Sequence, residues 1–126
     1  MFAGHTALEI AGQVVIAVYF LAMLGKNMAL WDFNMERTGA ILPLPAVVLV
    51  SGFAVQIAGA LSLLFDFHAH LGAIALICFT FAATAMFHRF WSMDDPLRRN
   101  YHMLLLANNV AITGGLILVM GIAWPG

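Results

Sequence analysis

The stretch FHRFWSMDDPLRRNYHMLLLANNVAITGG, residues 87–115, lies between two long apolar runs and decides which fold the chain adopts. The flanking sequence is almost entirely Ala, Leu, Ile, Val, Phe and Gly. The stretch itself holds three of the five basic residues, two of the five histidines, an Asp-Asp-Pro turn and a pair of asparagines. This pattern predicts the polar end of a helix bundle that is otherwise embedded in lipid.

The composition supports a membrane location for most of the chain. Of the 126 residues, 63% are hydrophobic and only 9% are charged. A soluble domain of this size would need many more polar side chains to cover its surface. The net charge of −1 provides no basic face for nucleic acid, so no nucleic-acid partner is expected. The single cysteine, Cys78, excludes a disulfide within the chain and a cysteine-based metal site.

Four apolar runs are long enough to cross a membrane, which takes about 20 residues for a hydrocarbon core about 30 Å thick. They cover approximately residues 7–30, 44–65, 70–87 and 103–124. Backbone groups in lipid must be satisfied within their own segment, so each run is predicted to be a helix. The expected fold is an all-α membrane protein, a bundle of four transmembrane helices that forms a single domain over residues 1–126. No basic segment precedes the first run, so this run is expected to be a retained span, not a cleaved signal peptide.

The connections between the runs fit this count of helices. Pro43 and Pro45 interrupt any continuous helix between the first two spans and favour a helix start there. The tract DFHAH, residues 66–70, is so short that the second and third spans must be antiparallel neighbours. Asp95 followed by Pro96 is typical of an N-cap and first helical position. The fourth helix is therefore expected to begin before its apolar part.

The basic residues predict an orientation. All five lie in or beside the two longer connections: Lys26, Arg37, Arg89, Arg98 and Arg99. The N-terminal tail, the DFHAH tract and the C-terminal end contain no Lys or Arg. Cytoplasmic loops carry an excess of Lys and Arg, so both termini are predicted to face away from the cytoplasm.

A group of polar residues converges on the same end of the bundle and forms the candidate site. It consists of Lys26, His88, Arg89, Asn108 and Asn109, which come from three predicted helices. Their cationic and amide donors suit the carbonyl oxygens of a quinone or an anionic lipid headgroup. They equally suit a set of interfacial anchors, in which Lys26 extends its ammonium to the headgroups. Asn108 and Asn109 point about 100° apart, so at most one of them faces the bundle axis.

The other polar residues have simpler expected roles. Gln56, near the middle of the second span, is expected to hydrogen-bond another helix. His88 and His102 could share a depth and ligate haem or copper, and the outer histidines His5, His68 and His70 contain a weak metal-binding pattern. Histidine without metal is the expectation in both places. The glycines of the second and fourth spans are expected to form packing seams, namely Gly52, Gly59, Gly114, Gly115 and Gly121.

The motifs around the third and fourth spans resemble the DoxX family of small bacterial and archaeal membrane proteins. The matching residues are Gly25 and Lys26, then His88, Phe90 and Trp91, then Asp95, Pro96 and Arg99, and finally Asn109, Gly114 and Gly115. The likeness covers essentially the whole chain and is most specific in its last third. Asn108 stands where many members have lysine, which removes a charge embedded in the membrane.

The resemblance implies a place in the bacterial inner membrane and in a quinone-linked redox complex. In that membrane the outward-facing termini predicted from the basic residues would be periplasmic or extracellular. In that case the chain is an accessory or quinone-contacting subunit, and partner subunits hold the redox metals. No complete catalytic set occurs in the chain, so whether it acts as an enzyme stays open. The alternative is a purely structural subunit that fills an interface in a respiratory or photosynthetic assembly. Membrane lipids are expected ligands in either case.

Overall fold

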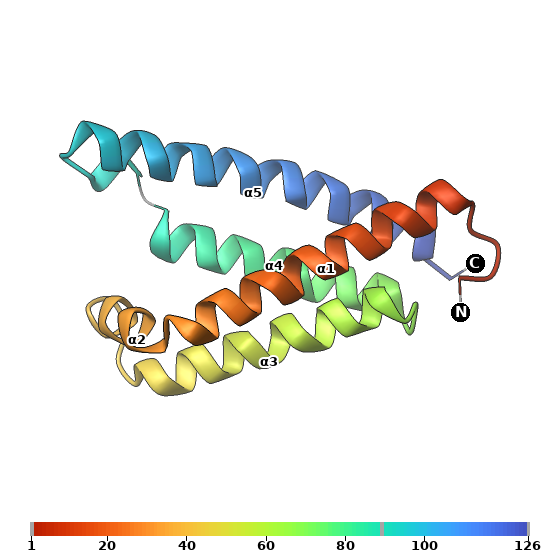
Figure 1. The fold of residues 1–126 in the computed structure, drawn as a ribbon, viewed down its shortest axis with the longest axis horizontal. Helices are drawn as coiled ribbons and strands as arrows, with labels where there is room; N and C mark the ends of the chain where they lie inside the picture. Colours follow the sequence, from red (N-terminus) through yellow and green to blue (C-terminus); the bar gives the residue numbers. More distant parts are fainter. Residues whose placement is uncertain (1, 89, 126) are drawn as a thin grey trace.

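The computed structural model describes residues 2–88 and 90–125, and these residues form a bundle of long helices (Figure 1). The elements are α1 (Ala7–Ala29), α2 (Trp31–Gly39), α3 (Pro45–Leu64), α4 (Ala69–Phe87), the 3₁₀ helix η1 (Phe90–Ser92) and α5 (Pro96–Ala123). Within this described part, α1, α3, α4 and α5 are each long and apolar enough to cross a membrane. The predicted all-α bundle of four membrane helices is therefore confirmed.

The ends of the helices follow local sequence signals. Asp95 caps α5, because its Oδ1 accepts a hydrogen bond of 3.3 Å from the Leu97 N–H. Pro96 occupies the first turn, so α5 starts well before Met103, where the apolar run begins. In the same way, Pro45 opens α3.

The helix α2 lies where the sequence predicts only a connection between the first two spans. It follows α1 after a break at Leu30 and carries the nine residues WDFNMERTG. The segment contains no proline, and its only glycine is the last residue. It is too short and too polar to give a hydropathy signal, yet its Asn34 and Thr38 are buried one turn apart against the bundle.

The two ends of the bundle differ in charge. Both termini lie at one end, called here the terminal end, together with the connection from α3 to α4 (Figure 1). The opposite end, called here the basic end, carries α2, η1 and the start of α5. Lys26, Arg37, Arg98 and Arg99 belong to the basic end, whereas Arg89 lies outside the described residues.

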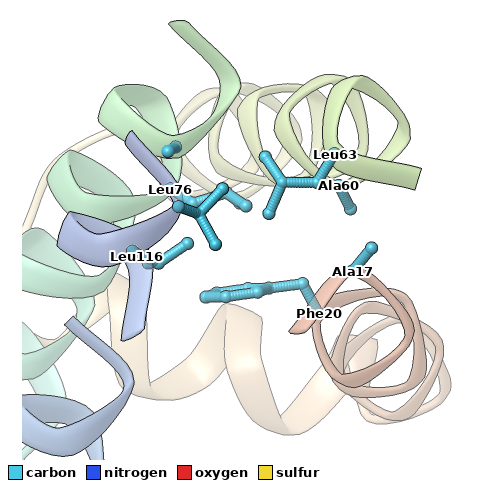
Figure 2. Close-up of a cluster of buried hydrophobic side chains, with 8 residues drawn as sticks. Ala17, Phe20, Ala60, Leu63, Leu76 and Leu116 are labelled. Atoms are coloured by element: carbon cyan, nitrogen blue, oxygen red, sulfur yellow. The ribbon is translucent and has the colours of Figure 1, made fainter. Parts of the chain in front are cut away.

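A close-packed apolar core fills the half of the bundle nearer the terminal end. Figure 2 shows its side chains gathered between the helices. Each membrane helix contributes to it: Ala17 and Phe20 from α1, Ala60 and Leu63 from α3, Ala73 and Leu76 from α4, and Leu116 and Val119 from α5. The outer faces carry exposed apolar side chains, such as Leu8 and Leu118. Lipid covers such faces in a membrane bundle.

Glycines set the closest approach, between α3 and α4. A Cβ added at Gly59 would lie 2.7 Å from the Leu76 Cγ, and one at Gly72 would lie 2.6 Å from the Ser62 Cβ. Neither separation occurs between real carbon atoms, so both positions need the absence of a side chain. The expected seam at Gly59 is present, and Gly72 is its unpredicted partner on α4.

The other expected seam glycines divide into two pairs. At Gly52 a Cβ would make an ordinary contact with Phe79, and at Gly115 it would lie 3.3 Å from the Ile16 Cδ1. At Gly114 and Gly121 a Cβ would meet nothing within 4 Å. The expectation that Gly114 and Gly121 form a packing seam is therefore wrong, because they do not face a neighbouring helix.

We expect Gly72→Ala to destabilise the bundle by about 1–3 kcal/mol, because the added methyl group forces α3 and α4 apart. Gly121→Ala is the matched control, since it adds the same methyl group into open space on a membrane helix. Thermal unfolding in detergent measures both. Equal melting temperatures for the two variants would contradict this account of the α3–α4 seam.

Candidate functional site: a cavity at the basic end

A cavity of about 560 Å³ lies in the half of the bundle nearer the basic end. Residues of α1, α3, α4 and α5 line it, and α2 contributes Phe33, Asn34 and Arg37. Phe20 belongs both to this lining and to the apolar core, so it marks the boundary between the hollow and the packed halves. The volume lies in the range of small-molecule sites.

The lining combines apolar walls with several polar side chains. Aromatic rings contribute on several sides, from Tyr19, Phe20, Phe33, Phe53, Phe79, Phe87 and Tyr101. The polar lining residues are Lys26, Asn27, Asn34, Arg37, Gln56, Thr80, His88, Tyr101, His102 and Asn109. Such a lining suits a ligand with a flat apolar body and a polar head.

Two buried amides leave one oxygen each without a partner. Gln56 is 1% exposed, and its Nε2 donates a hydrogen bond of 2.8 Å to the Phe20 carbonyl. Asn34 is 2% exposed, and its Nδ2 donates one of 2.9 Å to the Asn27 carbonyl. A carbonyl only accepts, so both amide orientations are fixed by their partners. Gln56 Oε1 and Asn34 Oδ1 are therefore buried acceptors that receive no hydrogen bond within the described chain.

Arg37 brings a positive charge from α2 to the cavity. Its Cζ lies 3.9 Å from the centroid of the Phe87 ring and 5.3 Å from that of Phe33, both within cation–π range. Its buried Nε has no hydrogen-bond partner, and no carboxylate of the described residues forms an ion pair with it. Burial lowers the pKa of Arg37, yet an arginine stays protonated in proteins. Arg37 thus offers the cavity a charged donor.

His88 and His102 contact each other directly across the gap between α4 and α5. Their Nδ1 atoms lie 3.0 Å apart, a hydrogen bond in which one ring donates and the other accepts. Burial lowers the pKa of His88 from 6.5 to about 4, and the charges of His102 and Arg37 add to this effect. His88 is therefore neutral at pH 7. The separation leaves no room for an iron between these two nitrogens, because two axial bonds would span about 4 Å.

Asn109 and Thr80 complete the polar lining between α4 and α5. Asn109 Nδ2 donates to Thr84 Oγ1 at 2.8 Å, and this hydroxyl donates to the Thr80 carbonyl at 2.7 Å. The Thr80 hydroxyl is itself buried and has no partner among the described residues. It adds a fourth unpaired polar group to the wall, after Gln56 Oε1, Asn34 Oδ1 and Arg37 Nε.

The structure unites part of the predicted site and adds residues that were not predicted. Lys26, His88 and Asn109 line the cavity, with Lys26 exposed in the last turn of α1. Asn108 is exposed and is not part of the lining, so Asn109 is the one that faces inward. The prediction for Arg89 lies outside the described residues.

The most important residues that the sequence analysis missed are Asn34 and Arg37. They lie three positions apart in α2, on the face that a helix would turn towards the bundle. The helical spacing of Asn34 and Arg37, within a segment predicted to be a connection, is the sequence signal that indicates a helix with an inward face. Gln56 was expected to bond another helix, and it does so through the α1 carbonyl of Phe20.

The terminal end carries a separate polar cluster that fastens the N-terminal segment. His5 lies 3.9 Å from Glu9 and 3.9 Å from Asp66, counted between nitrogen and carboxylate oxygen. Gln13 Nε2 donates to the Leu63 carbonyl at 2.9 Å and to Asp66 Oδ1 at 3.1 Å. Among residues 2–88 and 90–125, no group of three or more His, Cys, Asp or Glu is arranged to hold a metal ion.

The depressed pKa of His88 predicts a loss of stability in acid. The unfolded chain binds a proton at His88 below about pH 6.5, but the folded protein binds it only below about pH 4. The contribution of His88 to stability is thus fully present above pH 6.5 and is lost as the pH falls towards 4. Unfolding in detergent across this range should show the decline, and His88→Gln should flatten it. A His88 imidazole that titrates near 6.5 by NMR would contradict the prediction.

Comparison with known proteins identifies no relative of this chain: no protein-family model, no curated protein and no solved structure matches it. The resemblance to the DoxX family therefore rests on the sequence motifs alone.

Proposed function

We propose that this protein is a DoxX-like subunit of a quinone-linked redox complex, and that its cavity at the basic end contacts the quinone. One observation carries the proposal. The unpaired buried atoms Gln56 Oε1, Asn34 Oδ1 and Arg37 Nε belong to side chains that line one cavity between aromatic walls. Leaving such a group unpaired costs about 1–3 kcal/mol, so a ligand of the quinone class gains affinity where it pairs with one of them. A carbonyl or hydroxyl oxygen can accept from Arg37 Nε, and a hydroxyl group can donate to an amide oxygen.

The cavity has the properties that a quinone headgroup needs. A quinone presents a flat apolar ring and carbonyl oxygens that accept hydrogen bonds, which Arg37 Nε can donate. The rings of Phe33 and Phe87 already lie against the Arg37 guanidinium and offer apolar surface beside it. Lys26, at the last turn of α1, would contact an anionic lipid headgroup or the outer part of the ligand.

We also propose where the protein lies and how its role differs from that of its partner subunits. The chain would lie in a bacterial inner membrane with its basic end towards the cytoplasm and both termini periplasmic, following the positive-inside rule. Partner subunits of a larger complex would hold the redox centres. This chain would bind and orient the quinone at the edge of the bilayer.

Filling the cavity should prevent quinone binding. We expect Ala83→Phe, which places a ring among the lining residues, to weaken the binding of a short-tail quinone at least about tenfold. Ala111→Phe is the matched control, because Ala111 is exposed on α5 and lies outside the lining. Binding is measured with purified protein in lipid nanodiscs, and quinone carried through gentle purification is identified by mass spectrometry.

A wild-type protein that carries no quinone and binds none in nanodiscs would contradict the proposed function. The purely structural role would then explain the chain better. Native mass spectrometry of the gently purified complex shows in the same preparation whether partner subunits are bound.

A further inference from the structure

We propose that the cavity binds the reduced, hydroxyl-bearing form of the quinone more tightly than the oxidised form, and that Gln56 and Asn34 make the distinction. The inference rests on the proposed function, namely that a ligand of the quinone class occupies the cavity. It adds the redox state that is bound preferentially and the two residues that select it.

The preference for the reduced form follows from which atoms of the two amides already form hydrogen bonds. Gln56 Nε2 and Asn34 Nδ2 each donate to a main-chain carbonyl, of Phe20 and Asn27 respectively. These carbonyls cannot donate, so neither amide can turn its oxygen to the carbonyl without placing two acceptors face to face. The atoms left unpaired are therefore the oxygens, which need a donor, and both side chains line the cavity.

The two redox forms of a quinone differ in this respect. The oxidised ring carries carbonyl oxygens, which only accept hydrogen bonds, whereas the reduced ring carries hydroxyl groups, which both donate and accept. An oxidised ring in the cavity would leave Gln56 Oε1 and Asn34 Oδ1 unpaired, or would displace water from them without replacing its hydrogen bonds. A hydroxyl of the reduced ring can donate to either oxygen.

The remaining polar groups do not oppose this preference. Arg37 Nε donates, and both a carbonyl and a hydroxyl oxygen can accept from it. The Thr80 hydroxyl and the imidazole pair of His88 and His102 can each donate or accept. We therefore assign the discrimination to the two buried amide oxygens of Gln56 and Asn34.

The same oxygens disfavour an anionic headgroup deep in the cavity. Phosphate oxygens are acceptors and carry negative charge, so they would meet the amide oxygens without any hydrogen bond between them. Arg37 and Lys26 attract a phosphate, but only towards the basic end. An anionic lipid is therefore the competing occupant for the experiment to exclude.

The experiment measures the affinity of the protein in nanodiscs for a short-tail ubiquinone and for the matching ubiquinol, kept reduced under anaerobic conditions. We expect the ubiquinol to bind about tenfold more tightly, the effect of satisfying one buried acceptor. Gln56→Met keeps the size of the side chain but removes the oxygen, so it should abolish most of this difference. Asn34→Leu tests the same point from α2, should Gln56→Met fail to fold.

The matched control is Gln13→Leu. Gln13 is also a buried amide that bonds a main-chain carbonyl, but it lies near the terminal end and outside the cavity. Its substitution should lower stability and leave the ratio of the two affinities unchanged.

The possible outcomes separate the two proposals. If both forms bind equally, or ubiquinone binds more tightly, the redox preference is wrong while quinone binding stands. If neither form binds, both proposals are wrong. If an anionic lipid displaces ubiquinol by direct competition and neutral lipid does not, the cavity is a headgroup site and the inference is overturned.

Discussion

A polar atom buried inside a membrane bundle must find a partner within the protein or in a ligand, because lipid supplies none. This chain obeys the constraint strictly near its terminal end. There Gln13 bonds both the Leu63 carbonyl and Asp66, and the main-chain N–H of Phe2 donates to the same carboxylate. Near the basic end, among the described residues, five side chains keep unpaired buried atoms, namely those of Asn34, Arg37, Thr38, Gln56 and Thr80. The half near the terminal end is thus held by satisfied polar contacts, and the half near the basic end keeps the unpaired groups from which we propose ligand binding.

One half of the bundle is packed and the other is hollow because side-chain size determines how closely the helices approach each other. Gly59 and Gly72 let α3 and α4 touch near the terminal end, and the small side chains of Ala17 and Ala60 keep α1 close to them. Towards the basic end α1 and α5 diverge (Figure 1), and side chains of both helices line the cavity between them. A rigid packed half beside a hollow half provides a fixed frame for a binding site.

Much of the fold could be predicted from the sequence, because its signals are local. Apolar runs of membrane length predicted the four membrane helices, and the Asp95-Pro96 pair located the start of α5. The spacing of Asn108 and Asn109 showed that only one could face inward. Which of them does so depends on how α5 is rotated against α4, and that is a result of packing between distant segments.

The cavity itself could not be predicted, because it depends on the part of the chain with the weakest sequence signal. A nine-residue amphipathic helix such as α2 is too short to be stable alone and gives no hydropathy peak. It nevertheless supplies Asn34 and Arg37, without which the cavity would lack its guanidinium group and one of its two buried, unpaired amide oxygens.

The placement of Arg37 shows how α2, a short helix that is not a candidate membrane span, contributes to a cavity between the long helices. A guanidinium paired with a carboxylate would hold its donors in that ion pair, but Arg37 rests on the faces of Phe33 and Phe87 instead. A cation–π contact stabilises the charge through the ring face and leaves the N–H groups at the edge of the guanidinium plane available. The aromatic rings thus position Arg37 for an incoming oxygen without competing for its hydrogen bonds. The amide groups of Gln56 and Asn34 show the same arrangement. Their nitrogens donate to main-chain carbonyls, and their oxygens receive no hydrogen bond from the described residues.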